Sequence, residues 1–369
     1  MRLVYLSPVP WVSFAQRPHK FVEWFQGRTG DEVLWVDPYP TRFPSLSDFR
    51  RLGAKEDRQQ CSNPPWLRVI RPPAVPIEPL PGSGWVNALL WRRLFNELDA
   101  FASQQPTLLA IGKPSALALA VVGRFRGARS VYDAMDDFPA FYSGLSRLAM
   151  RWREQKLVRR VSTVLASSTA LKQRWSGLRE DVQLVHNGLD LNVLPPPKLS
   201  DATRTRKVLG YMGTIATWFD WEWVIELAKS RPTDVVRLIG PVFAPAPVAL
   251  PQNIEMLPPC THQAALVAMQ DFDVGLIPFK KNSLTASVDP IKYYEYRALG
   301  LPVISTDFGE MALRGDEEGT FISRGVQDVN GLVQNALRYS AGADYLQQFA
   351  ARNSWEARFA GAEIIQLLT

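Results

Sequence analysis

Short apolar runs alternate with helix-length amphipathic stretches along the whole chain, and this alternation limits the fold more than any other feature of the sequence. Such runs, bounded by Gly, Pro and Asp, are typical of strands buried on both faces, and the stretches between them are typical of crossover helices. In the first half we expect helices at 85–103 and 144–160. The expected strands are Leu3–Leu6, Val33–Val36, Leu67–Ile70, Leu108–Ile111, Val131–Tyr132, Val164–Ala166 and Val182–Val185.

The same alternation restarts in the second half of the chain. Before it lies Leu194–Lys198, whose three consecutive prolines cannot continue a helix or a central strand. We therefore predict an α/β fold of two doubly wound parallel-sheet domains, with the Pro-rich stretch Pro38–Pro81 as a long excursion from the first. The second-half elements expected are strands at Val208–Met212, Val235–Ile239, Asn253–Met256, Val274–Ile277 and Pro302–Ser305, and helices at 220–230, 262–270 and 290–299.

Composition excludes several classes of protein. Cys61 and Cys260 lie one in each half without CxxC spacing, so neither a disulfide framework nor a zinc site is predicted. No signal peptide and no apolar stretch of about 18 residues is visible, so a cytoplasmic protein is expected. The net charge of +6 is too small to indicate nucleic acid as a partner. Residues 1–190 hold 26 Lys and Arg against 17 Asp and Glu, which predicts an anionic surface or phosphate-bearing ligand there, unless the arginines are simply solvated.

The helix expected at 290–299 carries the most specific pattern. Lys292 and Glu295 lie three residues apart near its N-terminal end, where the helix dipole and free amides favour an anion. An ammonium for phosphate and a carboxylate for two vicinal hydroxyls suit the diphosphate and ribose of a nucleotide. The alternative is an ordinary Lys–Glu pair on a helix surface.

Several segments occur in the order found in GT-B fold glycosyltransferases of the group 1 type. The stretch from Ser287 to Thr306 resembles the C-terminal half of these enzymes, and the other matching segments are Leu209–Thr214, Leu238–Pro241, Ala268–Pro278, His186–Asp190 and Ser354–Glu356. The resemblance implies two Rossmann-like domains facing a central cleft. Its expected parts are an acceptor domain at 1–193, a linker at 194–205, a donor domain at 206–345 and a C-terminal helix at 346–369 that returns to the first domain.

The resemblance also implies donor-binding residues. Glu295 would hold the ribose, and the Gly213–Thr214 backbone would lie near the diphosphate. Many retaining members carry a Glu eight residues before Glu295, but this chain has Ser287 there, and Asp289 is the nearest replacement. The stereochemistry therefore stays open. Because the loop after Met212 lacks Arg and Lys, the missing positive charge is expected from Lys280, Lys281 or Lys292.

Acceptor-side candidates follow two strands of the first domain. Asp133, Asp136 and Asp137 would repel one another unless a cation or hydroxyl ligand lies among them, and the segment resembles one in bacterial exopolysaccharide and teichuronic acid glycosyltransferases. By that analogy Asp136 or Asp137 is the base that deprotonates the acceptor hydroxyl; the alternative is a helix N-cap with an acidic neighbour. Arg17 is expected to contact acceptor phosphate or donor. His19 is a further candidate base, or else a cap or packing residue.

Residues 145–160 combine Leu145, Leu148, Ala149 and Trp152 at helical spacing with six basic residues and one acidic residue. Such a helix could rest on an anionic membrane surface, with Trp152 at the interface. A core-facing stripe with a solvated basic face is the alternative.

Together these features predict a metal-independent hexosyltransferase without a cofactor. It would move a sugar from a nucleotide diphosphate donor, UDP favoured over GDP or dTDP, to a saccharide or lipid-linked acceptor at the cytoplasmic membrane face. A nucleotide-sugar 2-epimerase of the same fold and a non-catalytic sugar-nucleotide-binding protein are the alternatives. A dinucleotide dehydrogenase is disfavoured because no Gly-x-Gly-x-x-Gly follows an early strand.

Overall fold

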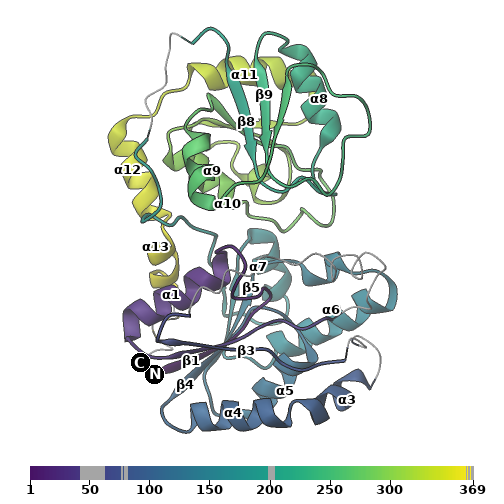
Figure 1. Ribbon diagram of the computed structural model, residues 1–369, viewed down its shortest axis with the longest axis vertical. Helices are drawn as coiled ribbons and strands as arrows, with labels where there is room; N and C mark the ends of the chain where they lie inside the picture. Colours follow the sequence, from purple (N-terminus) through teal and green to yellow (C-terminus); the bar gives the residue numbers. More distant parts are fainter. Residues whose placement is uncertain are drawn as a thin grey trace. The chain divides into compact units, whose positions relative to one another are not determined.

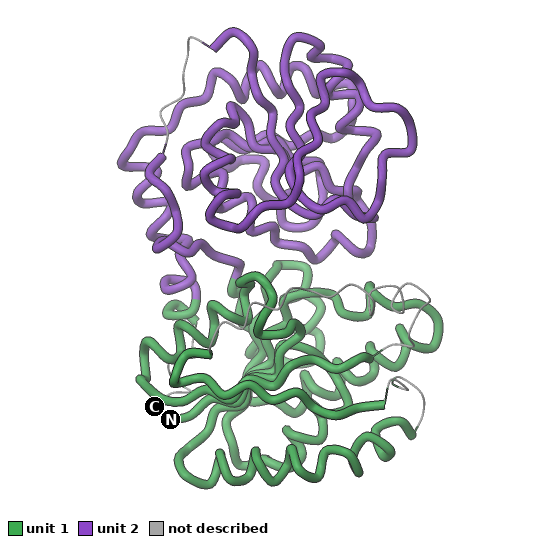
Figure 2. Tube along the Cα trace, in the orientation of Figure 1, with its two compact units in different colours: residues 1–185, 359–369 green, residues 186–358 purple. Residues whose placement is uncertain are grey.

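The computed structural model describes residues 1–41, 63–75, 78, 82–197, 204–362, 364 and 366. The chain divides into two compact units, which Figure 2 shows in green and purple. Unit 1 comprises Met1–Val185 and Phe359–Thr369, and unit 2 comprises His186–Arg358. The chain thus passes between units at Val185–His186, eight residues before the end of the expected acceptor domain. The expected Pro38–Pro81 excursion lies largely outside the described residues, as do Lys198 and Cys61.

Within the described part of unit 1, seven parallel strands form one sheet in the order β3-β2-β1-β4-β5-β6-β7. The order reverses between β1 and β4, which is the point where a doubly wound sheet binds ligands at its carboxyl edge. All five residues of β4 and of β5 are buried, as expected for strands covered on both faces. The strands are β1 (Arg2–Leu6), β2 (Val33–Val36), β3 (Leu67–Ile70), β4 (Thr107–Ile111), β5 (Ser130–Ala134), β6 (Thr163–Ala166) and β7 (Val182–Leu184).

Helices cover the sheet of unit 1 (Figure 1). The expected helix at 85–103 is in fact two helices, α3 and α4, because Trp91 is buried at the turn between them. The expected helix at 144–160 is confirmed as α6. The helices are α1 (Arg17–Thr29), α3 (Ser83–Leu90), α4 (Arg92–Ala102), α5 (Ala116–Arg124), α6 (Gly144–Val158) and α7 (Thr169–Ser176), with a 3-10 turn, η1, at Phe138–Phe141.

The described part of unit 2 repeats this topology in a six-stranded parallel sheet of order β10-β9-β8-β11-β12-β13. The order reverses between β8 and β11, so their carboxyl ends mark the expected ligand site. Five of these strands lie within one residue of their predicted positions, and β13 was not predicted. The strands are β8 (Val208–Met212), β9 (Val235–Ile239), β10 (Ile254–Leu257), β11 (Val274–Ile277), β12 (Val303–Thr306) and β13 (Thr320–Ser323).

Helices of unit 2 include the two that carry the candidate donor residues. The single C-terminal helix expected at 346–369 is instead two described helices, interrupted at Asn353, and the first of them packs against α10 within unit 2. Phe359 packs on Phe21 and Trp24 of α1 in unit 1. The helices are α8 (Trp221–Ser230), α9 (His262–Met269), α10 (Ile291–Ala298), α11 (Val329–Arg338), α12 (Ala343–Arg352) and α13 (Trp355–Ala360), with short 3-10 turns η2 (Gly309–Leu313) and η3 (Val326–Asp328).

Candidate functional site

Lys292 lies in the first turn of α10, against the turn that follows β8. Its ammonium is 5.6 Å from the centre of the Tyr211 ring and 6.0 Å from that of Phe279. The side chain fits there because Gly213 has no Cβ; an added Cβ would lie 2.6 Å from Lys292 Nζ. Burial lowers the pKa of Lys292, and the charge of Glu295 opposes this shift. In the described part of the chain no carboxylate lies within 4.0 Å of this ammonium, so it is available to an anion.

The turn at Gly213–Thr214 offers fewer free backbone N–H groups to a ligand than the sequence suggested. Gly213 has φ +142°, in the region that favours glycine, and its N–H donates to the carbonyl of Ile239 at 2.8 Å. That amide is therefore occupied within unit 2, and the expected position of the Gly213–Thr214 backbone near the diphosphate stays a prediction. Thr214 follows directly, and its carbonyl accepts from the Tyr211 hydroxyl at 2.8 Å, which fixes the turn beside Lys292.

Glu295 is buried one helical turn from Lys292. Its Oε1 lies 2.7 Å from Nε2 of His262, the first residue of α9. Within the described residues it makes no ion pair with Lys292, so the ordinary surface Lys–Glu pair is excluded. His262 is not among the predicted site residues. Because His262 and Glu295 are 33 residues apart, no local sequence pattern predicts their contact.

Asp289 lies next to Pro290, the N-cap of α10, but its carboxylate is already occupied. It accepts from the Tyr294 hydroxyl at 3.0 Å and from the backbone N–H of Asn187 at 2.7 Å, and Arg314 pairs with it at 2.8 Å. The residue is buried. Asp289 is therefore a correction to the predicted donor set: its oxygens join the start of unit 2 to α10, so they cannot replace a sugar-binding Glu.

Lys280 and Lys281 follow β11, at the other strand of the topological switch. Lys281 is exposed and paired with Asp307 at 2.7 Å. Lys280 is exposed, and no carboxylate among the described residues lies within 4.0 Å of its ammonium. Its backbone N–H donates to the carbonyl of Trp218 at 2.7 Å, which fixes its position behind the β11 strand end. Of the two lysines, Lys280 is the better candidate for a second positive charge.

In unit 1 the guanidinium of Arg17 is buried against Asp133. Arg17 Nε lies 2.9 Å from one carboxylate oxygen and 3.0 Å from the other, and Nη1 donates to the carbonyl of Val185 at 2.7 Å. Both side chains are almost completely excluded from solvent. The prediction that Arg17 contacts acceptor phosphate is therefore wrong, because the group is held inside the unit by a strand residue 116 positions away.

Asp137 is also paired. Its Oδ1 lies 2.5 Å from Arg174, which in turn contacts Glu154 at 3.3 Å. Glu154 is fully buried, and burial raises its pKa to about 8 while the charge of Arg174 opposes the shift. Tyr132 donates to Glu154 at 2.7 Å. This chain of contacts fixes Asp137 to α6 and α7.

Asp136 is the member of the acidic cluster that has no such partner. Among the described residues none donates a hydrogen bond to its carboxylate, which is mostly buried. Burial raises the pKa of Asp136 to about 7; the charge of Arg17 opposes this, and the carboxylates of Asp133 and Asp137 add to it. A mostly buried carboxyl group with a pKa near 7 is suited to accept a proton at neutral pH.

His19 does not fit the role of a base. Its Nδ1 accepts from the backbone N–H of Gln16 at 3.2 Å, and its Nε2 lies 3.0 Å from the carbonyl of Trp11. The ring is packed between Trp11 and Trp35, and burial lowers its pKa. Both nitrogens serve the start of α1, which is the capping alternative.

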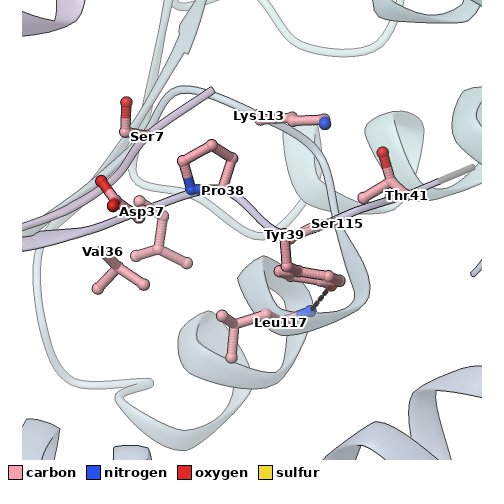
Figure 3. A pocket seen from close by; sticks show the side chains of 10 residues that line it. Ser7, Val36, Asp37, Pro38, Tyr39, Thr41, Lys113, Ser115 and Leu117 are labelled. Carbon is pink, nitrogen blue, oxygen red and sulfur yellow. Dashed lines mark hydrogen bonds between the residues drawn. The ribbon is translucent and has the colours of Figure 1, made fainter. Parts of the chain in front are cut away.

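A small recess opens at the carboxyl ends of β1, β2 and β4, with room for about one water molecule (Figure 3). Its floor is fixed by the Leu117 N–H, which donates to the Tyr39 hydroxyl at 3.2 Å. Polar side chains around it include Ser7, Asp37 and Lys113. The sequence analysis did not single out these residues, although each follows a strand end, which was the available signal.

No group of three or more His, Cys, Asp or Glu is arranged to hold a metal ion in the described part of the chain. Among the same residues, no helix combines the length and apolar character that crossing a bilayer requires. Metal independence stays a prediction.

Two Rossmann-like sheets of order 3-2-1-4-5-6 or its extension, each with candidate residues at the switch point, define the GT-B fold, and the predicted fold class is confirmed. Sucrose-phosphate synthase from Thermosynechococcus elongatus aligns over 100% of this chain and 99% of its own, with a TM-score of 0.68 and 15% identity. The Anabaena protein HepE in complex with UDP covers 100% and 99%, with a TM-score of 0.66 and 15% identity.

No protein-family model matches the chain. In sequence it is similar to the putative teichuronic acid biosynthesis glycosyltransferase TuaH of Bacillus subtilis strain 168, with 26% identity over 198 residues. The match covers 48% of this chain, and the chain spans about half the length of that relative. The resemblance to GT-B glycosyltransferases that the motifs suggested is confirmed at this level.

Proposed function

We propose that the protein is a glycosyltransferase that moves a hexosyl group from a nucleoside diphosphate sugar to a carbohydrate acceptor in cell-surface polysaccharide or glycolipid synthesis. The observation that carries the proposal is the Lys292 ammonium at the switch point of the second sheet, which has no carboxylate within 4.0 Å among the described residues. A partly desolvated cation in that position is suited to bind an anion. The teichuronic acid relative supports the same reaction class.

Donor binding is assigned to unit 2. Lys292 contacts the diphosphate and stabilises the negative charge that grows on it as the sugar–phosphate bond breaks. Glu295 accepts hydrogen bonds from the ribose hydroxyls, with His262 holding the carboxylate at 2.7 Å. Lys280 adds a second positive charge at the end of β11. These side chains supply the charge that a divalent metal supplies in other transferases, so no metal or cofactor is required by the proposal. UDP is the favoured nucleotide, since HepE was solved with UDP.

Acceptor chemistry is assigned to unit 1. As the acceptor oxygen bonds to the anomeric carbon, its proton passes to Asp136, and the electron pair of the broken bond leaves on the nucleoside diphosphate. Asp137 is not the base, because Arg174 holds it at 2.5 Å. A lipid-linked acceptor at the cytoplasmic membrane face is the proposed substrate.

The donor assignment is tested by thermal unfolding with UDP, GDP and dTDP, since a ligand that binds the folded state stabilises it by mass action. UDP should raise the melting temperature of the wild type and of Lys281→Met, whose side chain is exposed and paired elsewhere. It should not raise that of Lys292→Met. An equal shift in both variants would refute the role of Lys292.

Transfer itself is tested by the release of UDP with and without an added saccharide or lipid-linked acceptor. Acceptor-dependent release is expected of a transferase. Release or sugar inversion that ignores the acceptor would instead indicate a 2-epimerase, and donor binding without turnover on any acceptor would indicate a non-catalytic binding protein.

A further inference from the structure

Helix α6 buries Met150, Leu157 and Val158 together with a charged pair, but it also exposes three large apolar side chains, which is unusual for a surface helix. Leu145, Leu148 and Trp152 are 80%, 63% and 56% exposed. Their spacing of three and four residues places them on one helical face. The opposite face, which is buried, contains Arg153 and Glu154. The core-facing alternative for this stripe is therefore wrong.

Buried ion contacts fix this orientation of the helix. Arg153 pairs with the buried Glu78 at 2.9 Å, and Glu154 accepts from Tyr132 at 2.7 Å. Rotating α6 to bury its leucines would separate these buried charged groups from their partners, which is strongly unfavourable. The apolar stripe is thus held towards solvent by the packing of unit 1.

Helix α3 also exposes large apolar side chains. Trp85 and Leu89 are 86% and 70% exposed, whereas the polar Ser83 and Asn87 are buried. Asn87 is fixed by the backbone N–H of Val75, which donates to its amide oxygen at 2.9 Å. Both α3 and α6 pack against α5 (Figure 1). We call the exposed side chains Trp85, Leu89, Leu145, Leu148 and Trp152 the α3–α6 surface.

Within the described residues, the exposed charged side chains of α3 and α6 have one sign. The acidic residue of α6, Glu154, is buried, and α3 carries no charged residue. Lys156 Nζ lies 4.0 Å from the centre of the Trp152 ring. Other exposed basic side chains on α6 and at the start of α4 are Arg92, Arg93, Arg147 and Arg151.

We propose that the α3–α6 surface docks unit 1 on an anionic lipid bilayer. Exposed Trp and Leu beside Arg and Lys are the side chains of helices that lie in the interface of a membrane, with the apolar groups in the acyl boundary and the cations at headgroup phosphates. A second copy of the chain is a poorer occupant, because apposing two such surfaces would bring like charges together. The inference depends on surface chemistry alone and not on the proposed reaction.

Co-sedimentation of the whole chain with vesicles tests the proposal. Vesicles of phosphatidylcholine with 30% phosphatidylglycerol, about one lipid in three, should bind the wild type far better than phosphatidylcholine alone, and added salt should weaken binding. Arg147→Gln with Arg151→Gln should lower the partition coefficient about 25-fold, at about fivefold for each basic side chain. Leu145→Ser, Leu148→Ser and Trp152→Ser combined should abolish sedimentation.

The matched control is Leu313→Ser with Val248→Ser, which removes apolar side chains of unit 2 that are 64% and 59% exposed. The control should sediment like the wild type, and all variants should keep the wild-type melting temperature and its shift with UDP. Equal sedimentation of the triple variant and the wild type would overturn the proposal. So would absent vesicle binding together with a dimer that the triple variant loses. Vesicle binding without a UDP shift would leave the docking surface standing and refute the donor site.

Discussion

Replacing Asp136 by Asn should slow turnover strongly and at the same time stabilise the protein at alkaline pH. Burial raises the pKa of Asp136 from 3.8 to about 7. The folded state therefore binds the proton more tightly than the unfolded state, and stability falls as pH rises from about 4 to about 7. A shift of about three pKa units corresponds to about 4 kcal/mol, the most that ionising this group can cost the folded state.

Because Asn cannot ionise, Asp136→Asn should gain up to about 4 kcal/mol over the wild type at pH 8 and almost nothing at pH 4. Asp137→Asn is the control, since it removes the partner of Arg174 and should destabilise at pH 8. Urea unfolding at both pH values measures the two differences. A variant Asp136→Asn no more stable than the wild type at pH 8 would contradict the desolvation of this carboxyl group.

The same change should lower kcat about 10²- to 10⁴-fold, the usual effect of removing a general base. In the wild type, the acid limb of the rate profile should have its midpoint near pH 7, so the rate at pH 8 should be about tenfold that at pH 6. Donor binding, measured as the shift of melting temperature with UDP, should be retained. An Asp136→Asn enzyme within tenfold of wild-type kcat would refute the assignment of the base.

Three further outcomes are expected. Gly213→Ala should lose the rise in melting temperature with UDP and about 1–3 kcal/mol of stability. The new Cβ would lie 2.6 Å from Lys292 Nζ, on a backbone with φ +142°. The control Gly27→Ala has open space around its Cβ and should lose neither. His262→Ala should weaken UDP binding about tenfold without unfolding α9, because it removes the 2.7 Å contact that holds Glu295. An unchanged UDP affinity in calorimetry would exclude a positioning role for His262. Turnover should survive EDTA; residual activity under a tenth would refute metal independence.

The order and position of most elements followed from the sequence because most strands are short, largely apolar runs. The split of the 85–103 helix could not be predicted, since it depends on Trp91 being buried against partners distant in the chain. β13 was missed: its two apolar residues, Phe321 and Ile322, lie between a Thr and a Ser and are only partly buried. A helix or strand can be predicted from local sequence where its own residues determine its structure.

Candidate site residues were less predictable, because a side chain's role depends on partners from other elements. Lys292 and Glu295 share one helix, so their spacing placed them correctly near one another. Arg17 and Asp133 come from α1 and β5, and only their meeting inside unit 1 shows that Arg17 is buried. Asp289 likewise contacts Asn187 across 102 positions. Neither contact can be predicted from the residues that neighbour it in the sequence.

In the acidic cluster, two arginines pair with two of the three carboxyl groups and leave the third, that of Asp136, with a raised pKa. Arg17 neutralises Asp133, and Arg174 pairs with Asp137, so both carboxylates are fixed. Asp136 lies between them without a hydrogen bond from any described residue, near enough to their charges for its pKa to rise further. Had a cation paired with Asp136 as well, its charged form would be stabilised and its basicity lost. The arrangement therefore suits proton transfer at neutral pH rather than ion binding.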